Sequence, residues 1–142
     1  MPMEKSLEDV RSEFAADAFA VKTTGIQILE AKKGYAKVAL EVGPRHKNAI
    51  GNVQGAVYFA MADFAFAVAA NAFEQDGTAV VTLTGQINYL SSAHTSFLYA
   101  ESSVQKDGRS AVFYSAEVYE LVDGKKRLLA SAQNTGFKIA KP

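Results

Sequence analysis

One run of apolar residues constrains this chain more than any other feature. It extends from Gly55 to Phe73, is rich in alanine, and contains Asp63 as its single charged residue. As a helix the run would be about 28 Å long, close to the thickness of a membrane core. A membrane span is disfavoured, because alanine contributes little to insertion and Asp63 would lie near the bilayer midplane at a cost of about 2.5–3.5 kcal/mol. We therefore expect a long helix that is buried on every side within a soluble fold.

Extended segments are expected on both sides of this helix. Two precede it and four follow it, and short polar turns separate them. Lys106-Asp107-Gly108 and Asp123-Gly124 are typical of hairpin turns, which predicts that the last four strands form a meander of consecutive hairpins. The expected strands cover Ile26–Ala31, Tyr35–Val42, Thr78–Leu90, Thr95–Gln105, Arg109–Leu121 and Lys126–Ile139.

A short amphipathic helix is expected at the N-terminus. Apolar residues recur at helical spacing from Ser6 to Phe19, with Ser6 as N-cap and Asp9 three residues later, close to a capping box. The whole order predicts an α+β fold in which a curved antiparallel sheet wraps around one long central helix. The length fits a single domain, residues 1–142, with an N-terminal helical segment at 1–20.

Composition excludes several classes of protein. Fifteen basic residues balance fifteen acidic ones, which argues against a nucleic-acid-binding protein. The absence of cysteine excludes disulfides, thiol nucleophiles and thiolate metal sites, and two histidines make a zinc site improbable. The charged N-terminal sequence lacks the apolar core of a secretory signal, so we expect a cytoplasmic protein.

Asp63 is the first candidate for chemistry. Every residue three, four or seven positions away on the helix is apolar, so an unpaired carboxylate there would be costly and its pKa would rise. One interpretation is a hydrogen-bonded structural aspartate. The other is a carboxylate at the wall of a pocket, acting as nucleophile or general base.

The segment Asn48–Gly55 immediately before the helix is the second candidate. A helix N-terminus has free backbone N–H groups and a positive dipole end, so the N–H of Gly55 is suited to hold a developing oxyanion. Alternatively, Gly51 and Gly55 serve only the turn and close packing.

These residues carry a family resemblance. Asn48, Gly51, Gly55 and Asp63, spaced N-x2-G-x3-G-x7-D, resemble the hotdog-fold acyl-CoA thioesterases of the phenylacetate-degradation (PaaI-like) type. The resemblance covers about Gly25 to the C-terminus. It implies that Gly55 is the oxyanion glycine, that Asp63 is the catalytic carboxylate and that Asn48 positions water or the thioester. It also implies that Thr82 lies near the water.

One position departs from the family pattern. Where the family usually has His-Gly-Gly, this chain has Gln54-Gly55-Ala56. Gln54 still donates a hydrogen bond to a thioester carbonyl but does not exchange a proton at neutral pH. The departure bears on rate and substrate preference more than on fold.

The resemblance implies hydrolysis of an acyl-CoA thioester to a free acid and coenzyme A. No cofactor is expected, since coenzyme A is part of the substrate. The alternative is a non-catalytic acyl-CoA-binding or regulatory hotdog protein. Two basic runs, Arg45-His46-Lys47 and Lys125-Lys126-Arg127, are either solvated or contact the coenzyme A phosphates, and His46 and His94 are expected to be solvated.

Geometry predicts a site that two chains share. Gly55 and Asp63 are eight residues apart on one helix, about 12 Å along its axis, whereas a thioester carbonyl must lie about 3 Å from both groups. A two-fold partner packed through Ala60 and Ala67 would bring its Asp63 opposite Gly55 and Asn48. The resemblance implies the same dimer, often doubled to a tetramer.

Overall fold

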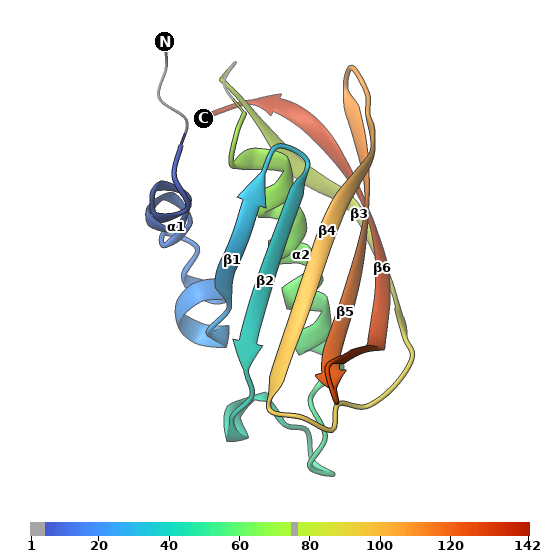
Figure 1. Ribbon diagram of the computed structural model, residues 1–142. Helices are drawn as coiled ribbons and strands as arrows, with labels where there is room; N and C mark the ends of the chain where they lie inside the picture. Colours follow the sequence, from blue (N-terminus) through green and yellow to red (C-terminus); the bar gives the residue numbers. More distant parts are fainter. Residues whose placement is uncertain (1–4, 75–76) are drawn as a thin grey trace.

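A six-stranded antiparallel sheet curves around one helix, α2 (Gly55–Asn71), as Figure 1 shows. The structure is a computed structural model that describes residues 5–74 and 77–142. The expected α+β class is confirmed, and the sheet has the strand order β1-β2-β4-β5-β6-β3. The strands are β1 (Gln27–Lys32), β2 (Tyr35–Glu41), β3 (Thr78–Tyr89), β4 (Phe97–Asp107), β5 (Ala111–Val122) and β6 (Lys125–Ala140).

Alternating side chains fix the two faces of the sheet. In β2, Ala36, Val38 and Leu40 are buried and point toward α2, while the residues between them are more exposed. Strands β5 and β6 are joined by the predicted two-residue turn, in which Asp123 and Gly124 both have positive φ (52° and 76°). Such a turn matches the twist of the two strands, which explains why this sequence forms a hairpin.

The predicted meander is wrong for β3. Strands β4, β5 and β6 are consecutive hairpins, but β3 pairs with β6 and β2 pairs with β4. The segment after β3, residues 90–96, therefore connects strands that are not neighbours. Turn residues show where a chain bends but not which strand it then pairs with. As a result, the second side of β3 has no partner strand among the described residues.

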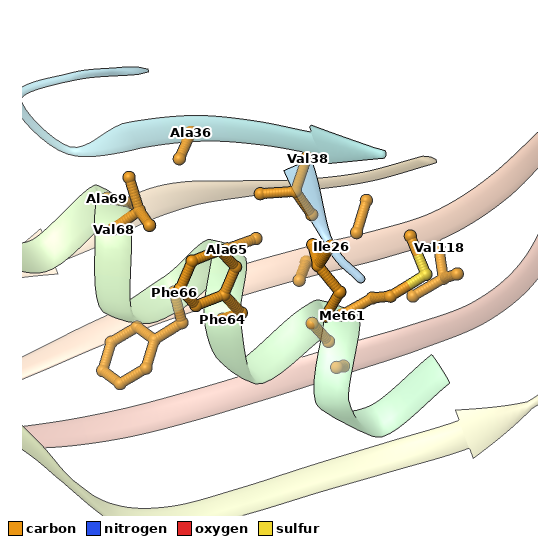
Figure 2. Packing of buried hydrophobic residues seen from close by; sticks show 14 of the residues in the cluster. Ile26, Ala36, Val38, Met61, Phe64, Ala65, Phe66, Val68, Ala69 and Val118 are labelled. Carbon is orange, nitrogen blue, oxygen red and sulfur yellow. The ribbon is translucent and has the colours of Figure 1, made fainter. Parts of the chain in front are cut away.

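The core lies between α2 and the concave face of the sheet. Figure 2 shows Met61, Phe64 and Phe66 of α2 packed in this layer, together with Val38 of β2 and Val118 of β5. Phe66 approaches Gly136 of β6 so closely that a Cβ there would lie 2.8 Å from the phenyl ring. Apolar burial on this scale is the main stabilising contribution to such a fold.

The expectation of a helix buried on every side needs correction. One stripe of α2, which we call the open face, is exposed or only partly buried, because a single sheet covers just one side of a helix. The open face consists of Ala56, Phe59, Ala60, Asp63 and Ala67. None of the described helices is long and apolar enough to span a bilayer.

The N-terminal helix is shorter than expected. Helix α1 (Leu7–Phe14) begins at Ser6, whose hydroxyl accepts from the Asp9 N–H in the predicted capping box, and it lies beside β1 in Figure 1. A separate π-helical turn, Phe19–Thr24, follows. Asp17, two residues before this turn, stabilises its beginning, because the Asp17 carboxylate accepts from the Ala20 N–H at 3.0 Å. Helix α2 ends at Asn71, two residues before the end of the apolar run, and Gln75 and Asp76 beyond it lie outside the described residues.

Candidate active site

The turn before α2 is organised by the side chain of Asn48. Its Oδ1 accepts from the N–H groups of Ile50 and Asn52, both at 3.1 Å, and Gly51 adopts a positive φ of 85° that favours glycine. The Nδ2 of Asn48 makes no hydrogen bond within the described residues. Asn48 therefore builds the turn with one end of its amide and keeps a free donor at the other.

The N-terminus of α2 carries unsatisfied donors. Gln54 occupies the N-cap position, but its exposed side chain does not cap the helix. The N–H groups of Gly55 and Ala56 have no acceptor in the parts of the chain that the structure describes. Tyr89 lies against Gly55, since a Cβ on that glycine would be 3.1 Å from the tyrosine Cε1. The absence of a side chain on Gly55 allows this close approach, and the free N–H groups make the helix end suitable for an anion.

Asp63 is partly exposed on the open face, about two turns beyond this end. Its Oδ1 lies 3.5 Å from the Thr82 hydroxyl, a long and weak hydrogen bond. Burial raises the pKa of the Asp63 carboxyl, the hydroxyl of Thr82 lowers it, and the negative charge of Asp17 raises it again, with a net increase. A carboxyl group with a raised pKa and little hydrogen bonding is a better proton acceptor than an ordinary surface aspartate.

Strand β3 runs along α2 in the opposite direction, so the two elements meet at three levels. Tyr89 faces Gly55, Gly85 faces Phe59, and Thr82 faces Asp63. The structure thus brings Thr82 to Asp63, and it brings Asn48, Gln54 and Gly55 to one end of the helix. It does not bring Gly55 to Asp63 within one chain, because eight helical residues span about 12 Å.

The segment between β3 and β4 forms a wall beside the N-terminus of α2. In Figure 1 this yellow segment and the teal turn before α2 lie at the same, lower end of the molecule. The fully buried Glu120 accepts from the N–H groups of His94 and Thr95, both at 2.8 Å, and from Arg127 at 2.6 Å. The Tyr58 hydroxyl accepts from the Ala93 N–H at 3.1 Å. These bonds fix the segment that follows Tyr89.

The expectation that both histidines are solvated is wrong for His46. His46 is 4% exposed: its Nδ1 accepts from the Gly43 N–H and its Nε2 donates to the Thr24 carbonyl at 2.7 Å. Through these two bonds the imidazole joins Gly43 to Thr24 and holds the turn in place. His94, by contrast, is exposed. Arg127 is engaged by Glu120, and Lys126 lies 3.5 Å from Glu117.

Comparisons with known proteins identify the family. A family model for the thioesterase superfamily matches residues 50–126. The chain belongs to the thioesterase superfamily. A relative described as a putative esterase, from Archaeoglobus fulgidus, is 32% identical over 114 residues, which cover 80% of this chain and 70% of the relative.

Solved structures of thioesterases share the fold. A thioesterase family protein from Silicibacter pomeroyi superposes with a TM-score of 0.85 at 22% identity, covering 95% of this chain and 99% of that one. PaaI from the E. coli phenylacetic acid degradation operon gives 0.78 at 24%, covering 96% and 98%. A mutant PaaI from Thermus thermophilus gives 0.73 at 28%, covering 84% and 97%. The expected hotdog fold and the PaaI-like resemblance are confirmed.

Two residues of this candidate site were not anticipated from the sequence. Tyr89 was not singled out for the site, because its place beside Gly55 depends on how β3 lies along α2. The sequence does contain a signal that identifies Glu120 as buried. Every second residue of this strand before it is buried, so alternation places Glu120 on the same inner face as Val112, Tyr114, Ala116 and Val118. The described residues contain no group of three His, Asp or Glu side chains arranged to hold a metal ion.

Proposed function

We propose that this thioesterase-superfamily chain is a cytoplasmic enzyme that hydrolyses acyl-CoA thioesters to a free carboxylic acid and coenzyme A. The observation that carries the proposal is Asp63, a partly buried carboxylate with a raised pKa and one weak hydrogen bond. A structural role would be expected to satisfy the carboxylate more fully.

The groups around the N-terminus of α2 take complementary roles. The Gly55 N–H holds the oxyanion that develops on the thioester carbonyl, and Gln54 and the free Nδ2 of Asn48 donate further hydrogen bonds. In the base route, Asp63 removes a proton from water, the water oxygen bonds to the carbonyl carbon, and the C–S bond breaks to release the coenzyme A thiolate. In the nucleophile route, an Asp63 oxygen bonds to the carbonyl carbon, and water then cleaves the resulting anhydride.

A single turnover in ¹⁸O-labelled water separates these two routes. Label that appears in the Asp63 carboxylate supports direct attack. Label found only in the product acid supports the base role. Thr82, whose hydroxyl faces Asp63, would hold the attacking water in either route.

Two chains are proposed to form each site, as a homodimer or a doubled homotetramer. Among the described residues, β3 has one edge without a partner strand and carries exposed Val81 and Leu83, and the open face of α2 has small residues over which a second helix could pack closely. A two-fold contact over these surfaces would place Asp63 of one chain opposite Gly55 of the other. Subunit exchange between Asp63→Ala and Gly55→Leu should restore activity in one of the two sites of the heterodimer. Verified heterodimers that stay inactive would refute the shared site.

The activity itself is tested by thiol release from a panel of short, long and aromatic acyl-CoAs. We expect wild-type turnover at least about 100-fold above that of Asp63→Asn for the preferred acyl group. The competing function, a non-catalytic acyl-CoA-binding protein, is favoured by Gln54, which replaces the usual histidine. Binding of acyl-CoA without turnover above Asp63→Asn would establish that alternative.

A further inference from the structure

A cavity lies at the opposite end of α2 from the proposed thioester site. It has a volume of about 120 Å³ and is bounded by the last turns of the helix and by strands β3 to β6. Ala69 lies about 20 Å along the helix axis from Gly55, so the two sites are separate. Apolar cavities of about 150 Å³ admit a molecule the size of benzene, which sets the scale of what this one would take.

The size of the cavity follows from three small residues in its wall. Ala69 and Ala70 project little volume from α2, and Gly34 contributes no side chain between β1 and β2. Gly34 cannot be enlarged without strain, because its φ is +79° and a Cβ would lie 2.8 Å from Val104. The larger apolar side chains of the lining are Phe73, Val80, Val104 and Val112.

A single uncharged donor faces this apolar lining. Tyr114 is 5% exposed and lines the cavity, yet its hydroxyl makes no hydrogen bond within the described residues. Its ring is held at 5.1 Å from the ring of Phe66 in an edge-on contact, so the hydroxyl is fixed in place. Burial, and then the charges of Asp107 and Glu74, raise the pKa of Tyr114 to about 12, so the hydroxyl keeps its proton at neutral pH.

The charges of the described lining residues balance each other. Lys138 contacts the Asp107 carboxylate at 2.7 Å and donates to the Gly108 carbonyl at 2.9 Å. The other charged residues of the lining, within the part of the chain that the structure describes, are Lys33 and Glu74, which have opposite signs. An anionic ligand would meet two carboxylates beside the Tyr114 hydroxyl, and a cationic ligand would meet two lysines. Neither sign of charge is favoured.

We propose that this cavity binds a small uncharged molecule, about one aromatic ring in size, whose single polar oxygen accepts a hydrogen bond from Tyr114. An aromatic alcohol has this chemistry. The proposal goes beyond thioester hydrolysis and does not depend on it.

The test is a titration with benzyl alcohol, toluene and benzoate, followed by the ¹³C-methyl NMR signals of the wild-type chain. Val80, Val104 and Val112 line the cavity, while Val38 and Val118 are buried elsewhere and serve as internal controls. We expect saturable shifts confined to the three lining valines. Benzyl alcohol should bind about fivefold more tightly than toluene, the value of one neutral hydrogen bond, and benzoate should not bind.

Two variants make the result decisive. Tyr114→Phe keeps the ring and should make benzyl alcohol and toluene bind equally, and Ala70→Leu should fill the cavity and abolish both. Thermal unfolding verifies that each variant is folded, and Tyr114→Phe alone suffices if Ala70→Leu is not. The proposal is overturned by absent shifts at the lining valines, by benzoate binding as tightly as benzyl alcohol, or by an unchanged preference in Tyr114→Phe.

Discussion

Glu120 and Asp63 are both withdrawn from bulk water, but the fold surrounds them in opposite ways. Glu120 is fully buried, and its carboxylate receives two backbone N–H groups and the guanidinium of Arg127. Burial alone would raise the pKa of Glu120, but the N–H groups of Thr95 and His94 and the charge of Arg127 outweigh it, and the net pKa is lowered. Asp63 is only partly buried, has one weak contact, and its pKa is raised.

This difference in hydrogen bonding distinguishes a structural carboxylate, Glu120, from a candidate reactive one, Asp63. The Glu120 carboxylate accepts hydrogen bonds that hold the segment beside the N-terminus of α2. Because its oxygens are already bonded, this carboxylate is not available for a reaction. The Asp63 carboxylate stabilises little of the fold, and its lone pairs remain available to substrate or water. Burial by itself therefore identifies neither role; the number of hydrogen-bond donors that reach the carboxylate distinguishes them.

The largest effect should come from neutralising each acid in turn. Glu120→Gln removes a buried charge that Arg127 and two N–H groups require, so the free energy of unfolding should fall by about 3 kcal/mol. Asp63→Asn should leave that free energy unchanged or higher. Urea denaturation measures both, with the exposed Glu117→Gln as matched control, expected within about 0.5 kcal/mol of wild type. Equal losses for Glu120→Gln and Asp63→Asn would contradict the comparison.

The two acids should also show opposite dependence on pH. The lowered pKa of Glu120 contributes stability above its unfolded pKa of about 4.3, and this contribution is lost as pH falls through the lower folded value. The stability gap between wild type and Glu120→Gln should therefore narrow in acid. The raised pKa of Asp63 means that its ionisation opposes folding, so Asp63→Asn should be the more stable form at neutral pH.

In acid, that advantage of Asp63→Asn should disappear, because wild-type Asp63 is then protonated in both states. Urea denaturation of the three proteins from pH 7 to pH 3 follows both gaps. The unfolding free energy of wild type minus that of Glu120→Gln is positive and should fall in acid, whereas the same difference for Asp63→Asn is negative and should rise. Two differences that change with pH in the same direction would show that the environments of Glu120 and Asp63 do not differ as described.

A smaller effect is expected where the wall segment meets α2. Tyr58→Phe removes the acceptor of the Ala93 N–H and should cost about 1 kcal/mol of unfolding free energy. Tyr89→Phe is the control, since its hydroxyl makes no hydrogen bond within the described residues. Hydrogen exchange at the Ala93 amide should accelerate in Tyr58→Phe only. Unchanged exchange in that variant would show that Glu120 and Arg127 hold the segment without help from α2.

The smallest effect on stability should follow Thr82→Val. The long contact to Asp63 is worth little, so the unfolding free energy should stay within about 0.5 kcal/mol of wild type. Because the Thr82 hydroxyl lowers the pKa of Asp63, its removal should move the acid limb of the pH–rate profile of thioester hydrolysis to higher pH. Thr82→Ser should restore the wild-type profile. A profile that Thr82→Val leaves in place would remove Thr82 from the site.

Local sequence determined much of this protein. The alanine-rich run with one aspartate predicted α2 and its exceptional residue, extended segments between polar turns predicted all six strands to within a few residues, and Asp123-Gly124 predicted the β5–β6 turn. The capping box at Ser6 and Asp9 likewise appears as expected. These features depend on the conformational preferences and the burial pattern of residues that are close together in the sequence, so the local sequence is enough to predict them.

Only the tertiary structure decided how these elements meet. The pairing of β3 with β6 rather than β4 depends on contacts between residues far apart in sequence, and turn chemistry does not encode it. That pairing sets Tyr89 against Gly55 and Thr82 beside Asp63. It also leaves the open face of α2 and one side of β3 uncovered. The roles of Asp63 and Glu120 differ for the same reason, since the donors that reach a carboxylate come from whichever segments the fold brings to it.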